Sequence, residues 1–289
     1  MANSNTEPAG LDDGTLRQQE TQLDAILAAM GSALVAFSGG VDSTYLAWAA
    51  RRVLGARAVA ATVLSPLNPP GESAAAVETA RRIVIRHETL VFDPLELDAF
   101  RTNPADRCYH CKLELMGRLQ LLARDLGLAV VADGENADDV ADWRPGRRAT
   151  AELGVRHPLV EAGLGKGAIR RLSRMAGLPT AERPALACLA SRIPYGTPIT
   201  ADLLERIGHG ETFLFAQGFS NCRLRHHGDT CRIEVPPDEL PLLLEQARRT
   251  AVIACLRALG YTYITLDLEG YRTGSLNAGL AGRFPEESS

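Results

Sequence analysis

The chain has 289 residues, of which 46% are hydrophobic and 23% are charged, and its formal net charge is −4. This composition is ordinary for a globular protein with one or two domains and a substantial core. The acidic balance disfavours a general nucleic-acid binder, and no apolar run approaches the ~18 residues that cross a bilayer. We therefore expect neither nucleic acid nor membrane among its partners.

The N-terminal segment, residues 1–14, is polar and acidic. It lacks the basic start and apolar centre of a signal peptide, so the sequence predicts a cytoplasmic protein with a frayed N-terminal tail. In that compartment the six cysteines are not expected to form structural disulfides. They are therefore either packing residues or participants in chemistry.

The first half of the chain alternates strand and helix patterns. Apolar runs predict strands over 33–37, 58–64, 87–92 and 128–132. Helical spacing predicts helices over 15–30, from a glycine turn to about 54, and over 72–84, 112–126 and 166–176. This alternation is typical of an α/β fold with a parallel sheet, whose ligands bind beyond the carboxyl ends of the strands. Loops at 38–43, 65–71 and 133–142 leave those ends, so we expect an active site there.

The pattern changes after residue 198 to that of a small α+β domain. Its predicted elements are a helix over 200–217, strands over 222–227 and 230–235, helical segments to about 259, and a strand over 261–266. We divide the chain into a tail (1–14), an α/β domain (15–198), a small α+β domain for substrate binding or oligomerisation (199–277), and a tail (278–289). Residues 144–198 are interpreted as functional loop apart from the helix at 166–176.

A glycine turn, Ser38-Gly39-Gly40-Val41-Asp42-Ser43, joins the first strand to the following helix. Paired glycines allow a sharp turn, and the donors and dipole of a helix N-terminus favour an anion, so a phosphate group is the expected ligand. The alternative is a turn that merely needs glycine. The string matches neither the Walker P-loop nor G-x-G-x-x-G. It resembles the PP-loop of the ATP pyrophosphatases, which cleave ATP between the α and β phosphates.

Cys108 and Cys111 form a C-x-x-C pair just before a predicted helix. Such a pair can be half a zinc site, although no second pair exists, or a redox dithiol, or two inert cysteines. Cys188 lies in a polar, proline-bound loop. Three thiolates suit an iron–sulfur cluster with one iron left open, while inert or redox thiols remain the alternatives. Cys222, Cys231 and Cys255 are expected to be packing residues.

An acidic segment, residues 133–139, leaves the fourth strand. Carboxylates near a phosphate loop indicate Mg²⁺ or hydroxyl recognition, and a solvated acidic turn is the alternative.

Arginines follow the acidic segment, at Arg144, Arg147, Arg148 and Arg156. They form either a basic face or, for one or two of them, a means of stabilising charge on the α-phosphate. Arg223 and Arg225 lie two apart on a predicted strand and so share one face of the sheet. They could clamp a phosphate, or they could form a simple exposed face.

These motifs, in this order over about residues 18–277, resemble the LarE family. The resemblance lies in the glycine turn, the acidic segment, and the strings at 144–146, 154–159, 187–196, 223–229, 232–235 and 267–272. The string Cys-Leu-Ala-Ser-Arg-Ile-Pro-Tyr-Gly at 188–196 is the most specific part, because many families share the PP-loop. Glu135 and His157 depart from the family pattern, which often has threonine and serine there.

The resemblance implies an ATP-dependent sulfur transferase in the synthesis of the nickel-pincer nucleotide, the cofactor of lactate racemase. The implied substrate is pyridinium-3,5-biscarboxylic acid mononucleotide. Each carboxylate becomes an acyl-adenylate, and sulfur then displaces AMP to leave a thiocarboxylate. Some family members sacrifice the cysteine that matches Cys188, which becomes dehydroalanine. Others use a three-cysteine 4Fe-4S cluster, and Cys108, Cys111 and Cys188 resemble that type.

The resemblance also suggests roles for the other site residues. ATP, with Mg²⁺ near Asp42, is assigned to Ser38, Gly39, Gly40, Asp42, Ser43, Val63, Gly134 and Asp138. The substrate or its phosphate is assigned to Arg144, Arg156, Ser191, Arg192, Glu211, Arg223, Arg225 and Glu234. We further expect a homo-oligomer that meets other enzymes of nickel-pincer cofactor synthesis transiently.

Rival interpretations share the PP-loop. A tRNA-thiolation enzyme also pairs it with three cysteines, but the net acidity and the lack of an added RNA-binding or zinc domain argue against it. An amide-forming ligase would need no cysteines, and an ATP-sensing module would release no pyrophosphate.

Overall fold

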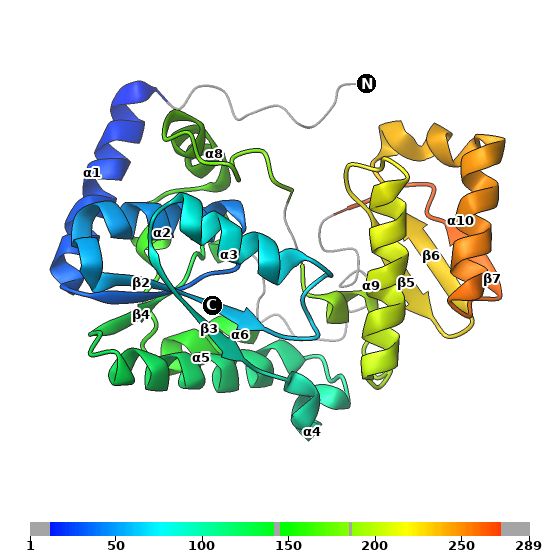
Figure 1. Ribbon diagram of the computed structural model, residues 1–289, viewed down its shortest axis with the longest axis horizontal. Coiled ribbons are helices and arrows are strands. Elements are labelled where there is room, and N and C mark those ends of the chain that lie inside the picture. The colour runs from blue at the N-terminus through cyan, green and yellow to red at the C-terminus, as the bar shows by residue number, and fades with distance from the viewer. Residues whose placement is uncertain (1–11, 142–144, 185–186, 273–289) are drawn as a thin grey trace, which may run out of the picture. The chain divides into compact units, whose positions relative to one another are not determined.

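The computed structural model describes residues 12–141, 145–184 and 187–272 (Figure 1). The described residues divide into two compact units. The first contains the residues up to 65 together with 71–100 and 105–184, and the second contains 66–70, 101–104 and 187–272. Each unit has its own sheet and its own apolar core.

The first unit is built on a four-stranded parallel sheet in the order β3-β2-β1-β4. The strands are β1 (Ala33–Ala36), β2 (Ala58–Leu64), β3 (Arg86–Val91) and β4 (Val130–Ala132). Strands β1 and β2 are continuous apolar runs and are largely buried, as a parallel sheet with two covered faces requires. The α/β class predicted from the sequence is therefore confirmed, and the strand bounds agree within two residues.

Helices cover both faces of this sheet (Figure 1). Val35 and Ala60 pack in the core that holds α2 (Val41–Leu54) and α3 (Glu72–Arg82), whereas Leu34 and Val59 pack with α5 (Arg107–Asp125). The remaining helices of this unit are α1 (Asp13–Met30), α6 (Pro145–Glu152), α7 (Pro158–Glu161) and α8 (Lys166–Met175), with short 3-10 turns at Gly55–Arg57, Pro94–Glu96 and Ala137–Ala141 and a helix α4 (Asp98–Arg101) at the border of the two units.

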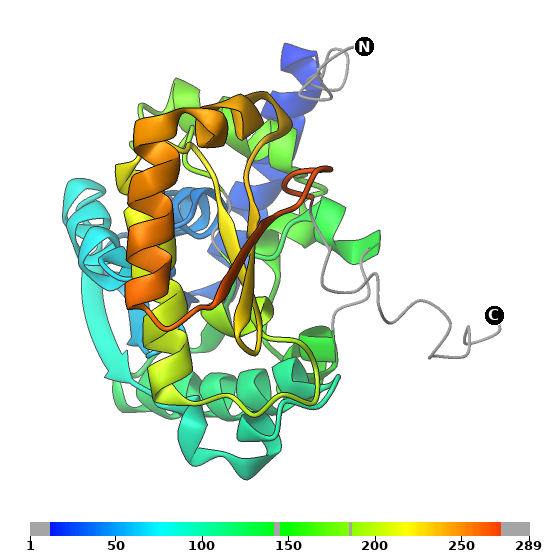
Figure 2. The same cartoon turned by 90° about the vertical axis from the view of Figure 1, so that its right-hand side faces the viewer.

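The second unit is a small α+β unit with a three-stranded sheet in the order β5-β6-β7. β5 (Arg223–His227) and β6 (Thr230–Glu234) form an antiparallel hairpin, and β7 (Tyr263–Leu266) pairs with β6 in parallel. Figure 2 faces this unit and shows α9 (Ala201–Ala216) and α10 (Gln246–Ala258) packed on the sheet. Two 3-10 segments, Leu189–Arg192 and Pro237–Leu244, complete it.

Two sequence-based expectations need correction. The predicted start of α5 at about residue 112 is wrong, because the helix begins at Arg107 and contains the C-x-x-C pair in its first turns. Pro104 and Asp106 precede that start, and both are helix-start signals. Residues 145–184 and 187–198 are also more helical than the loop prediction, because α6 and α7 are too short to show a helical period.

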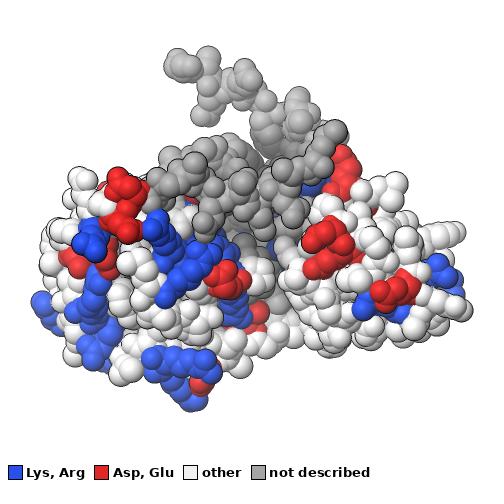
Figure 3. All heavy atoms as spheres, turned by 90° about the horizontal axis from the view of Figure 1, so that it is seen from above, with Lys and Arg blue, Asp and Glu red and all other residues white. Residues whose placement is uncertain are grey.

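The surface agrees with the balanced composition. Basic and acidic side chains lie next to one another on the face that Figure 3 views. Among the described residues, no helix combines the length and apolarity that crossing a membrane requires.

The fold predicts where α5 contributes stability. Leu119 is fully buried against β1 and β2, whereas Leu121 on the same helix is 54% exposed. Leu119→Ala should lower the free energy of unfolding by about 2–5 kcal/mol, because it leaves a cavity. The matched control Leu121→Ala should change it by less than about 0.5 kcal/mol. Urea unfolding followed by circular dichroism measures both, and equal effects would contradict the assignment.

Candidate functional site

The glycine turn lies at the carboxyl end of β1 and begins α2. Gly39 has φ +72°, and a Cβ there would lie 2.9 Å from the Cα of Ala76 in α3, so only glycine fits. Gly40 is the N-cap of α2, and the Oγ atoms of Ser38 and Ser43 lie 3.1 Å apart. The turn therefore presents hydroxyls and the first amides of α2 at one place, as a phosphate requires.

Asp42 lies in the first turn of α2 and faces Lys166 at the start of α8. The Lys166 Nζ atom is 2.5 Å from Asp42 Oδ2, while Asp42 Oδ1 is buried without a hydrogen-bond partner. Burial raises the pKa of Asp42 and Lys166 opposes that rise. The Asp138 carboxylate accepts the backbone N–H of Lys166 at 2.7 Å, so Asp138 caps α8.

Lys166 and Arg183 are two cations that the sequence analysis did not assign to the site. Arg183 donates to the carbonyl of Gly39 at 2.9 Å and pairs with Glu72 at 2.7 Å. A lysine in the first turn of a helix opposes the helix dipole, and this is the signal that could have drawn attention to Lys166. Arg183 lies in the segment after α8, and nothing in the local sequence there indicates a site residue.

The loop after β4 packs against the glycine turn through Gly134. A Cβ on Gly134 would lie 2.9 Å from the backbone N of Ser43, so this loop contacts the first turn of α2 directly. Its neighbours Asp133 and Glu135 are both buried. The interpretation of this segment as a solvated acidic turn is therefore wrong for these two carboxylates.

Five side chains form what we call the charge network: Lys112, Asp133, Glu135, Arg147 and His157. His157 Nδ1 lies 2.6 Å from Asp133 Oδ1 and 3.4 Å from Glu135 Oε2. Lys112 Nζ lies 3.0 Å from Asp133 Oδ2, and Arg147 Nε lies 2.6 Å from Glu135 Oε1. The two departures from the family pattern, at positions 135 and 157, are therefore neighbours.

Interactions within the charge network favour the ionised forms of Asp133 and His157. Burial alone would raise the pKa of Asp133, but the hydrogen bond from His157 and the charge of Lys112 lower it to about 2. Burial alone would lower the pKa of His157, but Asp133 and Glu135 raise it overall. The pair is thus a carboxylate and an imidazolium over the mildly acidic range.

Cys108 and Cys111 lie in the first two turns of α5, where the N-terminus of a helix favours thiolates. Cys108 is exposed and Cys111 is half-buried, and neither is in a disulfide. Helix α6 packs on this turn: Arg148 stacks 3.7 Å above the Tyr109 ring, and the Tyr109 hydroxyl donates to Glu152. The two cysteines are therefore accessible at a helix end against which α6 packs.

In the second unit, hydrogen bonds join five predicted site residues into one group, and a sixth, Arg223, lies on the same strand as Arg225. Arg192 and Glu211 make a buried two-bond pair with both distances at 2.8 Å, and Arg225 and Glu234 make another at 3.0 and 2.7 Å. Arg192 also donates to Ser191 Oγ, and Arg225 to the Ser191 carbonyl. Arg223, also buried, lies 4.8 Å over the Tyr271 ring.

We call these residues the arginine–glutamate group, and its Glu234 also pairs with Arg232, at 3.1 Å. Burial and the charge of the neighbouring Arg192 lower the pKa of Arg223, so these guanidiniums contribute to a common positive field. The alternative of a simple exposed arginine face is wrong, because Arg223 and Arg225 are both buried. Such a field suits an anion.

Cys188 belongs to the second unit and its side chain is exposed. Its carbonyl accepts the backbone N–H of Ser191 at 2.9 Å and the Arg192 guanidinium at 3.2 Å. The cysteine is therefore tied by its backbone to the arginine–glutamate group, which leaves the thiol outward.

Two residues assigned to the site lie apart from these groups, and a third is not described. Val63 on β2 is partly buried against the α5 side of the core. Arg156 pairs with Glu161 on the surface. Arg144 lies outside the described residues.

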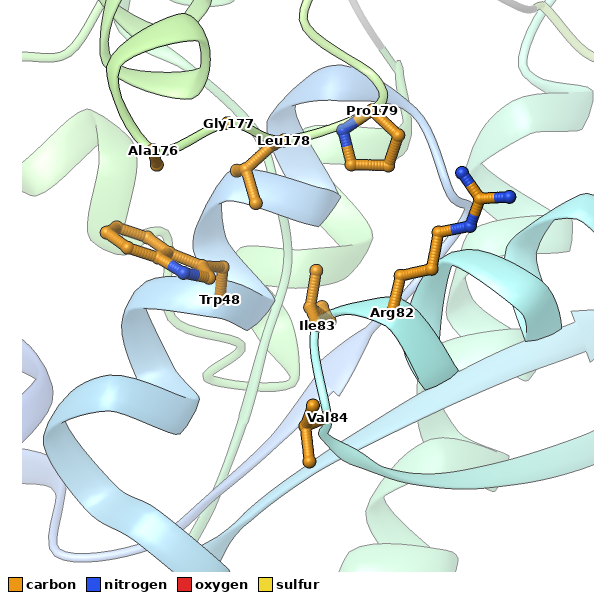
Figure 4. A pocket seen from close by; sticks show the side chains of 8 residues that line it. All are labelled: Trp48, Arg82, Ile83, Val84, Ala176, Gly177, Leu178 and Pro179. Atoms are coloured by element: carbon orange, nitrogen blue, oxygen red, sulfur yellow. The ribbon is translucent and has the colours of Figure 1, made fainter.

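A separate cavity of about 400 Å³ in the first unit contains none of the assigned residues. Figure 4 shows its lining, which includes Trp48, Arg82 and Leu178.

The parallel sheet, the Gly-Gly turn at the end of β1 and the small second unit define the class of the protein as a PP-loop α/β protein with a small C-terminal α+β unit. No family model matches the chain. It is 42% identical over 245 residues to an uncharacterised protein of Synechocystis sp., with 85% of this chain and 91% of the relative covered.

A second relative carries a functional name. The chain is 36% identical over 264 residues to the pyridinium-3,5-bisthiocarboxylic acid mononucleotide synthase of Lactiplantibacillus plantarum, with 91% of this chain and 95% of the relative covered. The chain therefore belongs to the family of that synthase, the LarE family. It is also 24% identical over 240 residues to an uncharacterised protein of Methanocaldococcus jannaschii, covering 83% of this chain and 90% of the relative.

The charge network predicts a pH window of stability. The pKa of Asp133 falls on folding, so its contribution is present above the ordinary value of 3.8 and is lost as the pH falls towards about 2. The pKa of His157 rises on folding, so its contribution is present below 6.5 and is lost as the pH rises through the folded value. The difference in Tm between wild type and Asp133→Asn should therefore be largest between about pH 4 and 6.5. A difference that does not vary with pH would contradict the assignment.

Proposed function

We propose that this protein is an ATP-dependent sulfur transferase that converts the carboxylates of pyridinium-3,5-biscarboxylic acid mononucleotide into thiocarboxylates. The observation that carries the proposal is the end-to-end similarity to a synthase named for the bisthiocarboxylic acid product. The glycine turn and the three cysteines supply the two chemical requirements, a phosphate site and a sulfur site.

The first step activates the carboxylate. A carboxylate oxygen is a poor leaving group and must first be converted into a better one. The carboxylate therefore attacks the α-phosphate of ATP, which forms an acyl-adenylate and releases pyrophosphate. The serines and first amides of the glycine turn would bind the β and γ phosphates. Lys166 and Arg183 lie at the same turn, where cations stabilise charge that builds on the transferring phosphate.

Asp42 fits a role beside Mg²⁺, because its Oδ1 is buried and accepts no hydrogen bond in the described structure. The ion supplies charge neutralisation for the phosphates when it is bound. Asp42 would then exchange or share its present contact with Lys166.

The second step transfers sulfur. A sulfur nucleophile attacks the acyl carbon, the C–S bond forms, the C–O bond to AMP breaks and AMP leaves with the electron pair. Cys108, Cys111 and Cys188 have the thiolate chemistry to hold a 4Fe-4S cluster, which would supply sulfide. The finer alternative is sacrifice of the Cys188 sulfur.

The arginine–glutamate group of the second unit would bind the mononucleotide phosphate. Arg223 and Arg225 carry the positive field, and Glu211 and Glu234 hold the guanidiniums of Arg192 and Arg225 in fixed planes. The buried pairs thus orient donors before the substrate arrives.

The proposal has a direct test. Purified protein with ATP, Mg²⁺ and the dicarboxylate mononucleotide should release pyrophosphate and AMP and give the thiocarboxylate by mass spectrometry. After anaerobic reconstitution with iron and sulfide, the protein should bind iron, and Cys108→Ala should lose it. Unchanged transfer by Cys108→Ala together with a dehydroalanine mass at Cys188 would establish the sacrificial route. Absence of any pyrophosphate release would refute the function.

The glycine turn allows a sharper test of the ATP site. Gly39→Ala needs a left-handed alanine and places its Cβ against the backbone of Ala76, so ATP-dependent pyrophosphate release should fall at least tenfold. Gly127→Ala is the matched control, because Gly127 also has positive φ, +69°, but has open space around its Cβ. Similar losses in the two variants would show that strain alone, rather than the turn, matters.

A further inference from the structure

The charge network joins three parts of the first unit. Lys112 comes from α5, directly after Cys111. Asp133 and Glu135 flank the glycine that packs on Ser43. Arg147 comes from α6, which packs along the first turns of α5. A chain of direct contacts therefore runs from the C-x-x-C turn to the phosphate-binding turn.

The two carboxylates in this chain of contacts are buried, so their cationic partners matter for stability. Asp133 and Glu135 are 6% and 8% exposed, so each carboxylate depends on its cationic partners. Removing one partner of a buried pair leaves an uncompensated charge and is strongly destabilising locally. Close packing adds to this: a Cβ on Gly146 would lie 3.0 Å from Lys112 Cδ, so α6 presses directly on the lysine stem.

His157 closes the charge network from a third direction. Its backbone follows Arg156, which bridges to Ala132 at the end of β4. Its ring nitrogen faces both carboxylates. Two negative side chains lie side by side here, and the imidazolium between them reduces their repulsion.

We propose that the charge network holds the C-x-x-C turn of α5 in register with the phosphate-binding turn, so that Lys112, Asp133, Glu135, Arg147 and His157 are positioning residues for sulfur transfer. The inference rests on the proposed function and deepens it. The network residues do not react. They fix where the cysteine pair lies when the acyl-adenylate is formed.

A divalent metal is the competing interpretation of the same side chains. One ligand atom each from Asp133, Glu135 and His157 lie within 4.8 Å of one another. Lys112 and Arg147 already lie at salt-bridge distance from the two carboxylates, however, and His157 is hydrogen-bonded to Asp133, although neither Glu135 oxygen accepts a hydrogen bond from the described residues. A doubly charged ion would have to compete with three cationic groups, so the observations favour internal support.

The experiment separates positioning from general damage. Lys112→Met removes the network charge that directly follows Cys111, Lys112→Arg restores it, and Arg124→Met is the control on an exposed part of α5. Two quantities are measured: thiocarboxylate formed per pyrophosphate released, and the iodoacetamide alkylation rates of Cys108 and Cys111 in the ligand-free protein. Glu135→Gln is a second variant that keeps side-chain shape.

Lys112→Met and Glu135→Gln should lower the product-to-pyrophosphate ratio at least fivefold and raise alkylation of the cysteine pair at least threefold. Lys112→Arg and Arg124→Met should stay near wild type. An unchanged ratio and unchanged alkylation in both variants would overturn the inference, as would stoichiometric binding of Zn²⁺ or Mn²⁺ that requires His157. Failure of wild type to release pyrophosphate would instead count against the proposed function, while the alkylation arm would still test the positioning.

Discussion

Parallel pairing of β1 with both β2 and β4 is the constraint on which the first unit depends. Because Val35 lies in register with Ala60 and Ala132, the chain leaves β1 and β4 at the same edge of the sheet. That edge places the glycine turn against Gly134. The helices on both faces bury the strands and so hold this register.

The strands, the class of fold and the glycine turn follow from local patterns. β2 is a continuous apolar run, and the Gly-Gly turn stands between a strand and a helix, so both are visible in the sequence. The start of α5 was misplaced because residues 107–111 show no apolar period, so the period begins later than the helix does. The contacts of Lys166 with Asp42 and of Arg183 with Gly39 join residues more than 120 positions apart, and no local pattern encodes such pairs.

Both units bury charged side chains, and they pair these charges differently. The second unit holds its arginines with glutamates in planar two-bond pairs, which fix direction as well as charge. The first unit uses a lysine, an arginine and a histidine around two carboxylates, with single contacts. Planar pairing suits recognition of a shaped anion, whereas the mixed network suits fixing one piece of backbone against another.

The contact between Lys166 and Asp42 affects the charge at the glycine turn. The carboxylate at this turn already has a counter-charge supplied by the chain itself. The Lys166 ammonium therefore offsets the negative charge of Asp42 within the folded chain. Under the proposed function, a divalent ion that binds beside Asp42 would replace one cation with another at a carboxylate that is already partly neutralised.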